Sequence, residues 1–470
     1  MNKISESTSA SSNPAEALAQ TMRQIYELGL TTTSGGNLSM LDDEGRIWIT
    51  PAGVDKGELR EDQVARVGTG VPGGFGGIDE NGQRDPDSAP RPSSELPFHG
   101  AIYAARSDLR AIFHAHPVSL VAFSIVRQVP DTRISAFSHA LCADPGFASY
   151  ALPGSDALGK EIAQTFAKGF DCVVLENHGV VVAGRTLREA FERLEALDLC
   201  ARTILCARTL GGERLLSSED LALGSEAARA TVTLAPALGF SEGRGEEAER
   251  KEADERELRR TICEIVRRAH RRRLFTSTQG ALSARLPGGG FLLTPRGIRL
   301  DQIESSDLVR LDPGRVPSAG SDPREVLHGA IYEAHPEVGA IAQGYGEKLA
   351  GFSTAGVSLP ARTIPESYIL VREPASVSFR ETLCEPATVA AALGTDNPVA
   401  LVDNDGALVL GANCLDAFDR MEVLESTAAA LIASRPLGEL AAMSDEQLVA
   451  LRRAFFPTGG FQGAPHGGSS

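Results

Sequence analysis

The sequence predicts an α/β protein in which one three-layer α/β/α domain, a sheet with helices on both faces, occurs twice. Four blocks of the first half return in the same order in the second half, as expected for a duplicated unit. Within each copy, helical patterns alternate with short apolar strands, which is typical of a sheet covered by helices. The length of 470 residues leaves room for two domains that each close their own core.

The predicted elements follow the same order in both copies. A helix comes first, and in copy two Ile262, Val266 and Ala269 have the spacing of a buried stripe. Short strands follow around the turn SGGN and the motif ITPAG, and then a helix over GAIYAA or GAIYEA. Apolar runs such as AIFHAHP and DCVVLENHG are expected to form further strands. Residues 68–92 are rich in Gly and Pro and predict a loop. The Gly-x-Gly-x-x-Gly pattern inside them is not interpreted as a dinucleotide site, because a proline interrupts it and no helix pattern follows it.

The repeated blocks set the expected domain limits. The paired blocks are 30–41 with 274–285, 49–54 with 293–298, 98–112 with 327–341, and 173–184 with 400–411. We expect, in order, a disordered N-terminus (1–14), a catalytic domain (15–235), a charged linker (236–254), a degenerate non-catalytic domain (255–450) and a flexible tail (451–470).

The composition excludes several classes of protein. With 62 acidic and 46 basic residues the chain has a net charge of −16, which opposes a broad surface for nucleic acid or anionic membrane. The first residues lack the apolar stretch of a secretory signal, and no later run reaches the length of a membrane span. The seven cysteines are scattered, which favours reduced thiols over disulfides. We therefore expect a cytoplasmic protein.

Two histidines stand at the end of an apolar run in copy one, LRAIFHAHP. In a strand, His114 and His116 point to the same face, where two imidazoles can close on one cation. Alone this pattern is a weak signal, since such histidines also bond to backbone. His178, after the strand CVVLE, is a third candidate ligand, and His99 is either a ligand or a packed helix residue. Three neutral imidazoles leave a divalent cation open positions for substrate oxygens, where it polarises a carbonyl or stabilises an enediolate.

Glu95, in PSSELPFHG, is the best candidate for an acid/base group. A partly desolvated carboxylate near a cation can carry a proton to or from substrate. The simpler interpretation is an acidic residue in the first turn of a helix, favoured by the helix dipole. Beside it, Ser93 and Ser94 provide hydroxyls and helix-start amides, and the SGGN turn at 34–37 is suited to a small anion. Such a turn is more often only a turn.

The ordered set TSGGNLS, ITPAG, PSSELPFH, HAHP and ENHG resembles the class II aldolase and adducin amino-terminal domain family, over most of copy one and more weakly over copy two. The resemblance implies a three-layer domain and a three-histidine site for a divalent metal, usually Zn²⁺, with Fe²⁺ or Mn²⁺ as alternatives. Carried over by motif, it makes His114, His116 and His178 the metal ligands and Glu95 the acid/base residue. Around a substrate phosphate or carboxylate it places Gly36, Asn37, Gly53, Ser93 and Ser94.

The activity that the resemblance implies is that of a metal-dependent lyase. It would cleave or form a carbon–carbon bond in a small hydroxy-carbonyl compound, sugar phosphate or sugar acid through an enediolate. Decarboxylases, dehydratases, epimerases and iron-dependent oxygenases use the same site in related domains and stay open. Another alternative is an adducin-like scaffold without turnover, against which the intact histidine trio argues. Ala52 is a departure, because sugar-phosphate aldolases carry a hydroxyl residue there.

The expected partners follow from the same resemblance. We expect a small anionic or polyhydroxylated substrate, no nucleic acid, no membrane, and a homo-oligomer. Family aldolases are commonly rings of four domains, so two tandem chains would form a pseudo-fourfold ring.

Copy two provides an internal control. Opposite His114, His116, His178, Glu95 and Asn37 it carries Gln343, Tyr345, Asp405, Arg324 and Ala281. The scaffold motifs persist while the candidate chemistry is absent, so we predict that copy two is non-catalytic. His328 persists opposite His99, which favours a structural role for His99.

Overall fold

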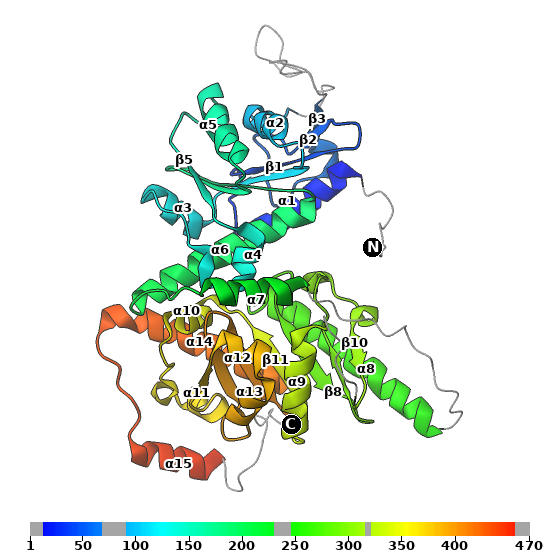
Figure 1. Cartoon of the computed structure of the whole chain (residues 1–470), viewed down its shortest axis with the longest axis vertical. Helices are drawn as coiled ribbons and strands as arrows, with labels where there is room; N and C mark the ends of the chain where they lie inside the picture. The colour runs from blue at the N-terminus through cyan, green and yellow to red at the C-terminus, as the bar shows by residue number, and fades with distance from the viewer. Residues whose placement is uncertain (1–12, 68–90, 230–245, 315–320, 456–470) are drawn as a thin grey trace. The chain divides into compact units, whose positions relative to one another are not determined.

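The computed structural model describes residues 13–67, 91–229, 246–314 and 321–455 (Figure 1). The predicted disordered N-terminus and the predicted loop lie outside these residues except for 13–14 and 91–92. Of the predicted flexible tail, residues 451–455 are described and belong to a helix, and the rest lies outside. The chain divides into two compact units. The first unit comprises Met1–Thr132 and Leu141–Ala201, and the second comprises Arg133–Ala140 and Arg202–Ser470.

The first unit is built on a mixed seven-stranded sheet with the strand order β3-β2-β1-β4-β7-β6-β5. The strands are β1 (Asn37–Leu41), β2 (Ile47–Ile49), β3 (Ala65–Val67), β4 (Ala111–Ala115), β5 (Gly146–Ala148), β6 (Cys172–Leu175) and β7 (Gly179–Gly184). Among these described strands, only the pair of β5 with β6 is parallel. Every residue of β4, β6 and β7 is buried, which fits strands that are covered on both faces.

Helices pack on both faces of this sheet. Phe98 of α2 (Leu96–Ala105) and Phe166 of α5 (Asp156–Ala167) share one core cluster with Ile112 and Val181 of the strands. The helices α1 (Pro14–Glu27) and α3 (Val118–Ile125) contact the strands from the other side (Figure 1). Helix α6 (Leu187–Thr209) begins in the first unit and ends in the second, while α4 (Ala136–Cys142) lies mostly, and α7 (Ser218–Arg229) wholly, within the limits of the second unit. The predicted three-layer α/β/α fold is confirmed.

The second unit repeats the same sheet, with the order β10-β9-β8-β11-β14-β13-β12. Its strands are β8 (Ala281–Arg285), β9 (Phe291–Leu293), β10 (Val309–Leu311), β11 (Ala340–Gly344), β12 (Ala375–Val377), β13 (Val399–Val402) and β14 (Gly406–Gly411). Its helices are α8 (Glu246–Arg271), α9 (Pro323–Ala334), α10 (Glu347–Ala355), α11 (Pro365–Leu370), α12 (Phe379–Cys384), α13 (Pro386–Ala392), α14 (Cys414–Ser434) and α15 (Asp445–Phe455). One core cluster joins α8, α10 and α14 to one face, and another joins α9 and α13 to the opposite face. The predicted duplication is therefore present in the fold.

The first helix of copy two, α8, has the stripe that its spacing predicts. Ile262, Val266 and Ala269 are buried in one core cluster. The helix runs without a break across the expected end of the linker at residue 254. The domain limits themselves stay predictions.

One buried hydrogen-bonded group occurs in both units. In the first unit, Ser39 Oγ lies 2.7 Å from His99 Nδ1 and 2.8 Å from Tyr103 Oη.

The second unit has the same contacts around Ser283. Its Oγ lies 2.8 Å from His328 Nδ1 and 2.9 Å from Tyr332 Oη. Each group ties the helix before the sheet's central strand to the neighbouring strand.

The two groups differ at one atom. His99 Nε2 lies 2.5 Å from Asn37 Oδ1, whereas His328 Nε2 is buried without a partner among the described residues. The position that matches Asn37 is Ala281, which offers no side-chain acceptor. The hydrogen-bonded chain is thus complete only in the first unit.

Two further features concern the helices and the cysteines. Among the helices of the described residues, we find none with the length and apolar character that a membrane crossing requires. All seven cysteines are free thiols, and only Cys384 is exposed.

Candidate metal and acid/base site

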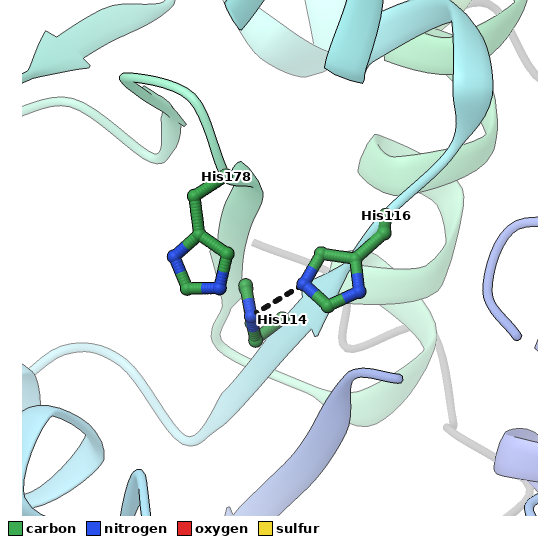
Figure 2. A group of neighbouring side chains, drawn as sticks. All are labelled: His114, His116 and His178. Carbon is green, nitrogen blue, oxygen red and sulfur yellow. Dashed lines mark hydrogen bonds between the residues drawn. The ribbon is translucent and has the colours of Figure 1, made fainter. Parts of the chain in front are cut away.

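Three histidines of the first unit meet at the end of β4 (Figure 2). His114 lies in β4, His116 directly follows this strand, and His178 lies in the loop between β6 and β7. One ring nitrogen from each histidine lies within 4.8 Å of the others, and the Nε2 atoms of His114 and His116 are 3.0 Å apart. The structure thus brings together the three residues that the sequence predicts as ligands.

The local sequence places His178 beside β4. Ala115 at the end of β4 pairs with Val180 near the start of β7, so the loop before β7 ends beside β4. Asn177 has a left-handed backbone (φ 55°) in this loop, a conformation that asparagine tolerates better than most residues. A Cβ on Gly179 would lie 2.6 Å from both Ala115 O and His116 Cδ2. Only glycine allows the loop to approach His116 this closely.

The histidines are held in the neutral form that binds metals. His114 Nδ1 donates to Val180 O at 3.0 Å, which leaves the lone pair of Nε2 directed toward the other rings. Burial, together with the neighbouring imidazoles, lowers the pKa of His114 and of His116 to about 3. Burial also lowers the pKa of His178. All three rings are therefore available as ligands at neutral pH.

These pKa shifts make the metal-free first unit sensitive to acid. The pKa of His114 and His116 is about 3 when folded and 6.5 in the reference state, so the unfolded chain binds more protons between these values. The free energy of unfolding is expected to be highest above pH 6.5 and to fall as the pH decreases toward 3, by about 1.4 kcal/mol per pH unit for each group. Urea unfolding at about pH 7.5 and about pH 5, followed by the fluorescence of the single tryptophan, Trp48, measures this loss. The variant His116→Gln should show a smaller loss than the wild type, and equal losses would contradict the explanation.

Glu95 lies beside the histidines. Its Oε2 is 3.4 Å from His114 Nε2, and its Oε1 is 3.8 Å from His178 Nε2. It immediately precedes α2, but its side chain does not cap that helix. The carboxylate points toward the imidazoles, which the simpler interpretation as a helix-start acid does not explain. Its role as the acid/base group stays a prediction.

A buried chain of hydrogen bonds orients this carboxylate. Asn37 Nδ2 donates to Glu95 Oε2 at 2.6 Å, and His99 Nε2 donates to Asn37 Oδ1 at 2.5 Å. Burial holds the pKa of His99 well below its usual value, so the ring is neutral. Its Nδ1 therefore accepts a hydrogen bond from the Ser39 hydroxyl, and the Ser39 oxygen accepts one from the Tyr103 hydroxyl. Each donor in this series of hydrogen bonds thus meets one acceptor.

This positioning role of His99 and Asn37 is not among the predictions from the sequence, although a signal for it was present. Glu95, His99 and Tyr103 are spaced four residues apart, which places them on one face of a helix. Asn37 and Ser39 alternate on one face of a strand. What the spacing could not indicate is that these two faces meet.

The Gly-rich turn lies against β4. Gly36 has a left-handed backbone (φ 67°), and a Cβ there would lie 2.5 Å from His114 O. Glycine is required for this approach, and the turn leads into Asn37 at the start of β1. Both polar atoms of the Asn37 amide are engaged within the hydrogen-bonded chain. Anion binding by Gly36 and Asn37 stays a prediction.

The remaining predicted substrate residues lie on two neighbouring segments. An isolated β-bridge joins Pro51 to Pro92, so the segment carrying Gly53 approaches the segment carrying Ser93 and Ser94. Ser93 is buried and Ser94 is exposed. A Cβ on Gly53 would meet no atom of the described residues within 4 Å. An anion-binding role for these three residues stays a prediction.

Comparisons with known proteins identify several relatives. The sequence model described as the Class II Aldolase and Adducin N-terminal domain matches residues 16–205 and again residues 260–432. A 3-oxo-tetronate 4-phosphate decarboxylase of Pectobacterium atrosepticum is 31% identical over 185 residues, 38% of this chain and 78% of that protein. An L-fuculose phosphate aldolase of Methanocaldococcus jannaschii is 29% identical over 181 residues, 37% of this chain and 87% of that protein. A solved L-fuculose 1-phosphate aldolase is 30% identical, covers 46% of this chain and 96% of its own, and has a TM-score of 0.39.

The two matched segments together span more than half of the chain, and each falls on one copy of the repeat. The resemblance seen in the sequence motifs is confirmed. The chain belongs to the class II aldolase and adducin N-terminal domain family and carries the domain of that family twice in tandem.

Proposed function

We propose that the first unit is a metal-dependent lyase that cleaves or forms a carbon–carbon bond in a small hydroxy-carbonyl compound by an aldol-type reaction. The observation that carries this proposal is the convergence of three neutral imidazoles beside one carboxylate, that of Glu95. Structural histidines seldom gather three lone pairs at one point, because each buried nitrogen needs its own partner.

The donor set fits a divalent transition metal. Three imidazole nitrogens without a thiolate suit Zn²⁺ first, with Fe²⁺ or Mn²⁺ as alternatives. His114, His116 and His178 would hold the ion. When bound there, a divalent cation polarises a substrate carbonyl and stabilises the negative charge that develops on oxygen as the carbon–carbon bond breaks.

Glu95 would move the proton that the reaction needs. In the cleavage direction it takes the proton of the hydroxyl group whose oxygen becomes the carbonyl of one product. It then delivers a proton to the carbon that the broken bond leaves on the other product. Asn37, which donates to Glu95 Oε2, keeps the carboxylate turned toward the histidines during both transfers.

The substrate class is proposed from the polar segments around the site. The turn at Gly36 and the segments at Gly53 and Ser93 offer backbone amides and hydroxyls to a phosphate or carboxylate. Relatives named for sugar-phosphate substrates, such as the L-fuculose phosphate aldolase, support a sugar phosphate or a sugar acid. The working protein is proposed to be a cytoplasmic homo-oligomer, in which two chains form a pseudo-fourfold ring.

Decarboxylation is the second candidate. It is favoured by the 3-oxo-tetronate 4-phosphate decarboxylase, which is 31% identical over 185 residues. The same chemistry applies, because loss of CO₂ beside a carbonyl also leaves negative charge on oxygen.

Elemental analysis of protein purified without added metal is the first test. We expect one transition-metal ion per chain. The protein is then screened with hydroxy-aldehydes, sugar phosphates and keto acids while oxygen is monitored. Carbonyl products without oxygen uptake and without CO₂ support the aldolase, release of CO₂ supports the decarboxylase, and oxygen uptake indicates an oxygenase. A metal-free protein that turns over none of these compounds would favour the adducin-like scaffold instead.

A further inference from the structure

The counterpart of the metal site in the second unit is a small cavity with a different chemistry. It measures about 50 Å³, and all of its lining residues belong to the second unit. The polar side chains of its wall include Arg296, Arg324, Gln343, Tyr345 and Asp405. Four of these match the candidate catalytic positions of the first unit, and Arg296 matches Ala52. The second unit thus carries other side chains at these positions, and they line a cavity.

Two guanidinium groups in this wall share a single carboxylate. The buried Arg324 donates from Nε and Nη2 to Asp322 Oδ2 at 2.9 and 2.6 Å, and from Nη1 to Gly280 O at 3.2 Å. Arg296 donates from Nε to Asp322 Oδ1 at 3.1 Å. Its two terminal nitrogens have no partner among the described residues. The side of the cavity formed by the arginines therefore carries one positive charge that Asp322 does not balance.

Asp405 does not fully supply the missing negative charge. Burial raises the pKa of its carboxyl to about 7, so the neutral acid is well populated at physiological pH. Its Oδ2 accepts from Gln343 Nε2 at 3.1 Å. The cavity as a whole therefore favours a monoanion.

Gln343 provides the second independent observation. The residue is only 5% exposed, and its Oε1 is buried without a hydrogen-bond partner among the described residues. Buried amide oxygens are nearly always paired. An acceptor left unpaired in the wall of a cavity indicates that a ligand with a hydroxyl or amine donor fits there.

We propose that this cavity binds a small hydroxy-carboxylate anion, with the carboxylate against Arg296 and Arg324 and the hydroxyl donating to Gln343 Oε1. The planar guanidinium matches the planar carboxylate through paired hydrogen bonds. The volume admits roughly four or five non-hydrogen atoms, since a water needs about 10–15 Å³ on the same measure. Glycolate has this size and both functional groups. The site is separate from the proposed lyase and requires no metal.

Isothermal titration of the full-length protein with glycolate tests the site. In Arg296→Gln the affinity for glycolate should fall about tenfold or more, because one of the two guanidinium groups that contact the carboxylate is lost. The matched control is Arg299→Gln, which removes an arginine outside the cavity that pairs with Asp301 and should bind glycolate like the wild type. Whatever the first unit binds is common to all these proteins, so the difference reports on the second unit.

A second variant tests the hydroxyl contact without changing charge. Gln343→Met keeps the shape of the side chain and removes the unpaired acceptor, so the protein should still fold. We expect the wild type to bind glycolate more tightly than acetate, which lacks the hydroxyl, and Gln343→Met to lose this preference.

The proposal would be overturned by the absence of glycolate binding, by equal binding in the wild type and Arg296→Gln, or by an unchanged preference for glycolate over acetate in Gln343→Met. Inorganic phosphate, titrated in parallel, should bind more weakly than glycolate. Tighter phosphate binding would reject the carboxylate as the ligand. The metal content of the first unit should be the same in every variant, which separates this test from that of the proposed lyase.

Discussion

Replacing His114 and His116 together by alanine should abolish metal binding and lower activity more than about a thousandfold, a loss of about 4 kcal/mol in transition-state stabilisation. The two side chains supply two of the three nitrogens that lie within 4.8 Å of one another, and a single imidazole holds a divalent ion weakly. Elemental analysis of the purified variant measures the first effect, and product formation measures the second.

The chain contains its own control for this experiment. Gln343 and Tyr345 occupy the matching places in the second unit, with Gln343 in β11 as His114 is in β4. The variant Gln343→Ala with Tyr345→Ala should keep the metal content of the wild type. If the histidine variant also kept its metal, the assignment of the ligands would be wrong.

Glu95→Gln is expected to lower kcat by about 10² to 10⁴ while the metal stays bound, because it removes the proton-transfer group and keeps the shape of the side chain. The amide oxygen of the new side chain can still accept from Asn37, so the hydrogen-bonded chain is preserved. Steady-state kinetics and metal analysis on the same sample measure both properties.

The matched control for this variant is Glu192→Gln. Glu192 lies on α6 of the first unit, pairs with Arg188 and has no contact with the histidines. It should leave kcat unchanged. Loss of metal from Glu95→Gln would make this residue a ligand, and an unchanged kcat would assign proton transfer to another group.

Much of the fold could be predicted because its signals are local. The repeated blocks indicate two equivalent domains, and the apolar runs around His114 and before His178 indicate buried strands that end in polar residues. The strand order could not be predicted in this way. It places β4 between β1 and β7, and these neighbours are far from β4 in the sequence, so no short pattern records the pairing.

The same reasoning applies to the candidate site. His114 and His116 share one strand end, so their convergence follows from the alternation of side chains. The contact of Asn37 with Glu95 joins residues 58 positions apart, and it depends on how the helix α2 packs on the sheet. Likewise, the charge of the second cavity depends on Arg296 and Arg324 facing the same Asp322, which the substitutions alone do not reveal.

The unpaired nitrogen of His328 shows how far the two copies share one buried framework. Among the described residues, we find no hydrogen-bond partner for His328 Nε2, whereas His99 Nε2 donates to Asn37 in the first unit. The ring of His328 is nevertheless held in place, because Ser283 engages its other nitrogen. The two copies therefore differ at the candidate site and at the asparagine beside it, while the buried serine, histidine and tyrosine beneath that site are common to both.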